Sequence, residues 1–201
     1  YGDVQEKLTG ITTKLLFYAL EFNRLDDGVL EAALKDDALA HYAPWIEDLR
    51  KEKPYQLSDE IEKLFHEKSV SGRGAWNRLF NETMTALRFG IGGEELGLEL
   101  TLNRLLDRDG AKRKEASRAL GDVFGKNLRL FTLITNTLAK DKEISDRWRG
   151  FDDVADSRHL ANRVERPVVD ALVGAVEDAY PRMSHRYYAL KARWMGQDKL
   201  A

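Results

Sequence analysis

Cysteine is absent from this chain of 201 residues. Its absence excludes a disulfide framework, a thiol nucleophile and a zinc site with cysteine ligands, and it fits a reducing compartment. The sequence also lacks an apolar run near the roughly 20 residues that a helix needs to cross a bilayer. We therefore expect no membrane-spanning segment and no membrane partner.

The chain also lacks the short motifs of several enzyme classes. Helical zinc sites of peptidases place two histidines four residues apart, with a glutamate between them. The pair His66-Glu67 begins such a motif, but Val70 stands where the second histidine is needed. The sequence contains neither a G-x-S-x-G elbow nor a phosphate-binding loop. We therefore predict no catalytic residue and no metal ligand within these residues.

Charge is abundant but uneven along the chain. Charged residues make up 33% and hydrophobic residues 43%, which is typical of a helix-rich globular protein. Residues 1–100 hold 12 Lys/Arg against 19 Asp/Glu, giving −7, whereas residues 101–201 hold 20 against 15, giving +5. A basic half attracts nucleic acid in some proteins. Here the basic residues suit solvated helix faces, and no basic stripe interleaved with aromatic residues is present, so we expect no nucleic-acid partner.

The spacing of apolar residues predicts an all-α fold made of many amphipathic helices. The strongest pattern lies between residues 111 and 148, where apolar residues keep to one face of a helix. Its members are Ala116, Leu120, Val123, Phe124, Leu128, Phe131, Ile134 and Leu138. We predict one long central helix over about 111–148, roughly 55 Å in length, against which the other helices pack.

A second pattern predicts a packing seam near the start of the chain. Apolar residues recur every three or four positions over residues 3–25, at Val4, Leu8, Ile11, Leu15, Ala19 and Phe22. Gly92-Gly93 indicates at most a short β-hairpin near 88–97. We divide the chain into an N-terminal helical region, 1–90, and the start of a second helical domain, 91–201.

The stretch from Arg147 to Arg163 carries the densest polar chemistry and has two interpretations. In the functional one, Arg147, Arg149, Arg158 and His159 line a groove and bind a carboxylate or a peptide backbone. In the structural one, Arg158 and His159 hydrogen-bond loop carbonyls and helix ends, which locks the long helix to the next. Irregular segments need such side chains to satisfy their backbone groups, and this favours the structural interpretation.

Long stretches of the sequence resemble oligoendopeptidase F, of the thimet-oligopeptidase-like zinc peptidases. The resemblance runs from about Leu15 to Gly196 and is carried by LLFYALEFNRLDD, WIEDLRKEKPYQLSDEIEKLFHEKSVSGRGAWNRLF, KNLRLFTLITNTLAKDKEISDRWRG, DSRHLANRVERPVVDALV and YPRMSHRYYALKARWMG. It implies a nearly all-helical, cytoplasmic zinc metalloendopeptidase that cleaves oligopeptides in a channel between two lobes. It also implies that His-Glu-x-x-His and a further Glu bind zinc downstream of these residues. This segment then binds no zinc, forms the non-catalytic lobe and is inactive alone.

The ends of the chain suggest an internal segment of a longer protein. It begins at Tyr1 rather than Met, and residues 197–201 show no clear terminus. The expected partners are the missing C-terminal catalytic lobe, an oligopeptide substrate and, through exposed apolar faces, a second copy of the segment in a homodimer. The alternative is an independent helical module that binds protein or nucleic acid without catalysis.

Overall fold

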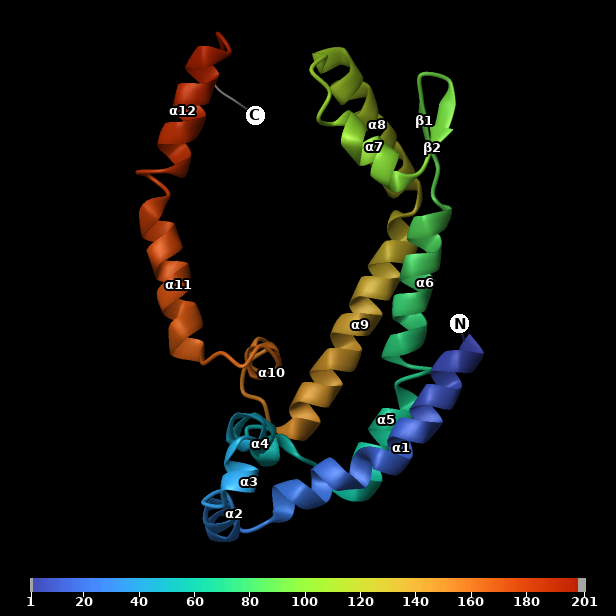
Figure 1. Cartoon of the computed structure of the whole chain (residues 1–201). Coiled ribbons are helices and arrows are strands. Elements are labelled where there is room, and N and C mark those ends of the chain that lie inside the picture. The colour runs from blue at the N-terminus through green and yellow to red at the C-terminus, as the bar shows by residue number, and fades with distance from the viewer. Residues whose placement is uncertain (1, 199–201) are drawn as a thin grey trace.

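A computed structural model describes residues 2–198 of the chain (Figure 1). Over these residues the chain forms twelve α-helices, one 3-10 helix (η1) and one antiparallel hairpin, which confirms the predicted fold class. The first half contains α1 Gly2–Arg24, α2 Asp27–Ala33, α3 Asp37–Ala40, α4 Ala43–Arg50, η1 Lys53–Tyr55, α5 Asp59–Lys68, α6 Arg73–Ala86, β1 Phe89–Ile91 and β2 Glu94–Leu96. The second contains α7 Leu98–Arg104, α8 Gly110–Lys126, α9 Leu128–Arg149, α10 Asp156–Ala161, α11 Arg166–Ala179 and α12 Ser184–Trp194.

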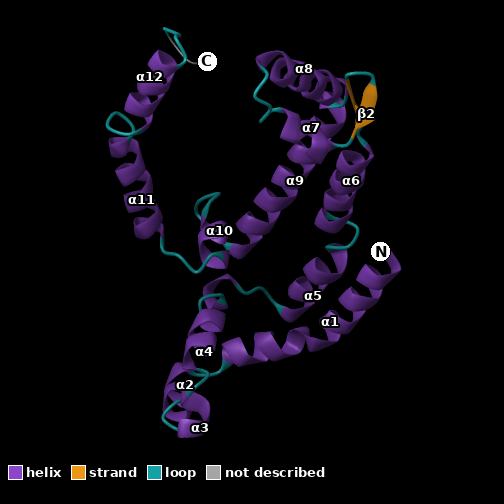
Figure 2. Ribbon diagram, turned by 45° about the horizontal axis from the view of Figure 1, so that its top comes forward, coloured by secondary structure: helices purple, strands orange, loops and turns teal. Residues whose placement is uncertain are grey.

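The helices form an open frame rather than a closed bundle. Helices α6 and α9 run side by side as a pillar, with α1–α5 at one end and α7, α8 and the hairpin at the other (Figures 1 and 2). Helices α11 and α12 form an arm that stands apart from this pillar in both views. The division into 1–90 and 91–201 falls inside strand β1, between Gly90 and Ile91, and it stays a prediction.

Because the frame is open, its solvent-accessible surface is large for a chain of this mass. That surface is 15265 Å², whereas a compact monomer of 23.0 kDa exposes about 9,600 Å². Much of the excess is apolar and lies on the α11–α12 arm, which we define as residues 166–195. Its large apolar residues are 42–72% exposed: Val168, Leu172, Val173, Val176, Tyr180, Met183, Tyr187, Tyr188, Trp194 and Met195. Within residues 2–198 nothing covers this arm extensively.

The single long helix predicted over 111–148 is wrong in one respect, because the chain breaks at Asn127 into α8 and α9. Asn127 has φ −101° and ψ 5°, and its side-chain amide donates a hydrogen bond to the carbonyl of Val123 at 2.9 Å. Such a side-chain bond to the backbone competes with the helical hydrogen-bond pattern. The break lets α8 pack on α7 and β1 while α9 packs on α6.

A chain of aromatic rings joins the two sides of this break. The ring centroids of Phe124 and Phe131 are 6.1 Å apart, Phe124 lies 5.8 Å from Phe89, and Phe131 lies 5.8 Å from Phe80. Phe89 is fully buried. It belongs to the predicted hairpin, whose turn residues Gly92 and Gly93 have φ values of 60° and 84° that favour glycine.

Most of the apolar seam predicted on α1 does not pack on another helix of the described residues, but Phe22 near its end does, with its ring centroid 6.0 Å from that of Trp45 in α4. Val4, Leu8, Ile11 and Leu15 are 50–69% exposed. Helix α1 instead turns its more polar face to α5, with Thr9, Leu20 and Asn23 buried. The Thr12 hydroxyl and His66 Nε2 lie 2.8 Å apart across this contact. Hydrogen bonding therefore makes the polar face suitable for burial, which apolar spacing alone does not predict.

A search of the helices over residues 2–198 found none whose length and apolarity suit a membrane span.

We expect Phe89→Ala to lower the free energy of unfolding by about 3–5 kcal/mol, because it removes a buried ring and leaves a cavity beside Phe124. Chemical denaturation followed by circular dichroism measures the change. The matched control is Phe17→Ala on α1, where the ring is 54% exposed and little stability is lost. Equal losses in the two variants would contradict the described core.

Candidate functional site

The four residues predicted to face substrate lie near one another in the chain but have different surroundings. Arg149 ends α9 and Arg158 lies in α10, and both line one cavity. Arg147 is exposed and pairs with Glu143 on its own helix, at 3.1 Å between Nε and Oε1. His159 is partly buried in α10 and is not among the residues that line this cavity. The structure therefore brings together two of the four side chains.

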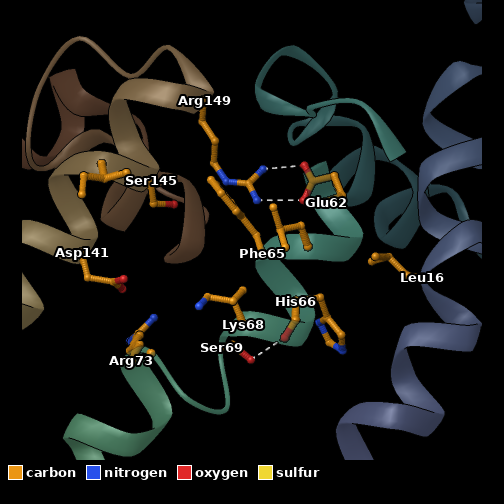
Figure 3. A pocket seen from close by; sticks show the side chains of 13 residues that line it. Leu16, Glu62, Phe65, His66, Lys68, Ser69, Arg73, Asp141, Ser145 and Arg149 are labelled. Carbon is orange, nitrogen blue, oxygen red and sulfur yellow. Dashed lines mark hydrogen bonds and ion pairs between the residues drawn. The ribbon is translucent and has the colours of Figure 1, made fainter. Parts of the chain in front are cut away.

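Arg149 is held by a two-pronged ion pair with Glu62. Its two terminal nitrogens lie 2.7 and 2.8 Å from the two carboxylate oxygens of Glu62, as Figure 3 shows. The same guanidinium donates to the carbonyl of Tyr55 at 3.1 Å and lies 5.9 Å from the ring centroid of Phe65. The Leu57 backbone N–H donates to Glu62 at 3.0 Å. This cluster, which we call the Arg149–Glu62 joint, fixes the end of α9 to the start of α5.

Both partners in the joint are charged. Burial of Glu62 acts to raise the pKa of its carboxyl, but hydrogen bonds from Arg149 and the Leu57 N–H outweigh burial and lower that pKa below its usual value. The hydrogen bond to Glu62 raises the pKa of Arg149 in turn. The side chains of Glu62 and Arg149 are only 11% and 26% exposed. These contacts hold the Arg149 side chain within the fold; the structural interpretation of Arg158 and His159 is a separate prediction.

Lys142 makes a second connection, between α9 and α10. Its ammonium donates to the carbonyl of Val154 and to the hydroxyl of Ser157, both at 2.8 Å, and it pairs with Asp146. These contacts hold the loop between the two helices against α9. The loop begins at Gly150, whose φ of +77° ends α9 in the left-handed region.

Two neighbouring cavities share Arg149 of the Arg149–Glu62 joint in their walls. The first, the α5–α9 cavity, has a volume of about 470 Å³ and is the one drawn in Figure 3. The second, the α9–α10 cavity, has a volume of about 560 Å³ and is lined by α6, α9, α10 and Phe151. Arg73, Asp141, Ser145 and Arg149 line both.

Three charged groups that line the α9–α10 cavity form no ion pair within residues 2–198. Arg158 lines the α9–α10 cavity, and Arg73 and Asp141 line both cavities. Neither these guanidinium groups nor this carboxylate has a partner within salt-bridge or hydrogen-bond distance among the described side chains. The arrangement therefore offers two cations to a ligand, with one carboxylate nearby.

Sequence reasoning did not identify Glu62, Lys142 or Arg73. Glu62 looks like an ordinary first-turn acid of α5, and 87 positions separate it from Arg149. Only the fold shows that these two residues meet. The sequence signal available for Arg73 is its place at the start of α6, after the turn at Gly72.

No group of three or more His, Cys, Asp or Glu side chains suited to hold a metal ion was found over residues 2–198. The side chains of the described part of the chain therefore do not fit a zinc site.

Residues 21–89 match the family model described as Oligopeptidase F. The whole chain also aligns with the crystal structure of oligoendopeptidase-F from Enterococcus faecium, with a TM-score of 0.81 and 22% sequence identity. This chain spans 40% of the length of that protein. A search of curated proteins found no match. The resemblance seen in the sequence is confirmed, and at this level of identity the structural match establishes the fold.

We expect Glu62→Gln to lower the free energy of unfolding by about 3 kcal/mol at neutral pH, because it leaves the Arg149 charge partly buried without its counterion. The estimate takes the low end for buried pairs since Arg149 keeps some solvent contact. Glu143→Gln is the matched control. It removes the same charge from an exposed pair with Arg147, and no measurable change is expected.

The difference in stability between wild type and Glu62→Gln also depends on pH. The folded state lowers the pKa of Glu62, so ionised Glu62 stabilises the fold fully above the unfolded value of about 4.5. This contribution is lost as the pH falls through the lowered folded pKa. Denaturation from pH 7 to pH 3 should show a constant difference that shrinks below about pH 4.5. A difference that grows on acidification would contradict the ion pair.

Proposed function

We propose that this chain is part of a zinc metalloendopeptidase that hydrolyses oligopeptides, like oligoendopeptidase F, and that it forms the non-catalytic lobe of that enzyme. The observation that carries the proposal is the alignment of the whole chain with 40% of oligoendopeptidase-F at a TM-score of 0.81. The match of residues 21–89 to the Oligopeptidase F family model supports it independently of the structure.

The exposed apolar surface gives a physical reason to expect a larger protein. Apolar residues on the α11–α12 arm are about half exposed or more, and their hydration opposes folding of the arm as it stands. A catalytic lobe packed against this arm buries that surface. We therefore propose that lobe as the chain's principal partner, and a homodimer as the state that the arm favours when the lobe is absent.

In this proposal the lobe forms the walls of the substrate channel and supplies no catalytic residue. The described side chains do not form a zinc site, so we place the zinc ligands, and the water activation that zinc supplies, in the remainder of the enzyme. Alone, this chain binds no zinc and has no peptidase activity. The parent enzyme is cytoplasmic, and Arg158 and His159 face its oligopeptide substrate.

Expression of the complete reading frame tests this proposal. We expect the frame to encode His-Glu-x-x-His with a further Glu, and the product to cleave oligopeptides in a reaction that a zinc chelator abolishes and added zinc restores. Replacing the glutamate between the two histidines should remove the activity, because it removes the general base. The 201-residue chain, assayed beside it with and without zinc, should be inactive.

A reading frame without the zinc motif would contradict the proposal, as would a full product that cleaves no oligopeptide. Either result would favour the independent helical binding module, without catalysis, as the function of these residues.

A further inference from the structure

We infer that the α9–α10 cavity binds the terminal carboxylate of a peptide through Arg158 and Arg73. The inference rests on the proposed function, which supplies oligopeptides as the ligand class. It goes further by naming the group that is recognised and the side chains that recognise it. Its evidence is the distribution of charge around the cavity.

Half of the charged residues that line the cavity are already paired within the fold. Arg149 is paired with Glu62 on both of its terminal nitrogens, and Lys142 is paired with Asp146. Lys142 also uses its remaining donors on Val154 and Ser157. These groups are therefore fixed parts of the wall and have little left to offer a ligand.

Two guanidinium groups remain, on different elements that the fold brings to one cavity. Arg73 is the first residue of α6 and Arg158 lies in α10, and neither has an ion-pair partner within residues 2–198. A guanidinium presents a planar set of donors that matches the two oxygens of a carboxylate. Two such groups that line one cavity from separate elements suit binding of a carboxylate within it.

The one unpaired carboxylate in the cavity, that of Asp141, lies close to the start of α6, where Arg73 is located. Asp141 Oδ1 is 3.9 Å from the position that a Cβ on Gly72 would take, directly before α6. Figure 3 shows Asp141 and Arg73 on the same side of the neighbouring cavity. Asp141 therefore reduces the positive potential around Arg73 and leaves Arg158 as the stronger anion-binding group.

The rest of the lining suits the end of a peptide. The hydroxyls of Ser145 and Ser157 and the amide of Asn77 provide uncharged hydrogen-bonding groups, while Leu138 and Phe151 add apolar surface. The volume of about 560 Å³ is in the range of small-ligand pockets. Two cations, one of them partly offset by Asp141, suit a single carboxylate better than a polyanion, whose binding depends on many contacts to phosphates.

Direct binding to the 201-residue chain tests the inference. The probe is N-acetyl-Ala-Phe with a free carboxylate, compared with the same dipeptide as a C-terminal amide, by titration calorimetry or NMR at low salt. We expect the acid to bind at least tenfold more tightly than the amide. Arg158→Gln and Arg73→Gln should each weaken binding of the acid at least fivefold and leave binding of the amide unchanged.

Arg129→Gln is the control, since Arg129 is an exposed arginine at the start of α9 that lines neither cavity. It should bind the acid as wild type does. Circular dichroism checks the fold of each variant. If Arg73→Gln unfolds, Arg158→Gln still decides, because the Arg158 side chain holds no other group in place. Inorganic phosphate is titrated separately to distinguish a peptide carboxylate from a general anion.

Equal binding of acid and amide would overturn the inference, as would no binding at millimolar concentration or a wild-type affinity in Arg158→Gln. Phosphate binding as tight as that of the acid would overturn the peptide as its ligand. These outcomes are independent of the peptidase assay. A chain that binds the acid but comes from a protein without a zinc motif contradicts only the proposed function.

Discussion

The arrangement of the two halves of this structure depends on the Arg149–Glu62 joint. It connects the last residue of α9 to the first turn of α5 and, through the carbonyl of Tyr55, to η1. A partly buried pair of this kind adds little net stability over an apolar contact, but losing one partner is costly. The stacking of Phe151 on Tyr55, with centroids 4.0 Å apart, places apolar contact beside the charges. The joint therefore sets the geometry between the pillar and the α1–α5 end more than it adds stability.

The frame that this joint organises cannot bury its apolar residues by itself. Helix α1 buries hydrogen-bonded threonines against α5 and leaves Leu8 and Leu15 in solvent. The α11–α12 arm likewise leaves apolar side chains exposed, and it does so over a larger surface. Both faces have the regular spacing of helices that pack on partners. Because these faces pack on little within the described residues, the accessible surface exceeds that of a compact monomer by more than half.

Local sequence signals predicted helices and the hairpin, but they predicted few of the contacts between these elements. The helical regions on both sides of residue 127 follow from the apolar spacing, and the hairpin turn follows from Gly92-Gly93. The break at Asn127 was missed because apolar periodicity continues through it. The partner of Arg149 was missed because it lies 87 residues away. The density of polar residues therefore predicted Arg149 as a candidate, while only the fold separates it from Arg158.

The ion pairs of Arg149 and Lys142 affect how the α9–α10 cavity can bind a ligand. Groups that are tied into ion pairs are held in fixed positions, so Arg149 and Lys142 give the α9–α10 cavity a rigid wall. A rigid wall lowers the conformational entropy that these protein side chains lose when a ligand binds. The same pairs also remove competing carboxylates, since Glu62 and Asp146 are already occupied. The joint that holds the frame together thus also determines which arginines remain available to an anionic ligand.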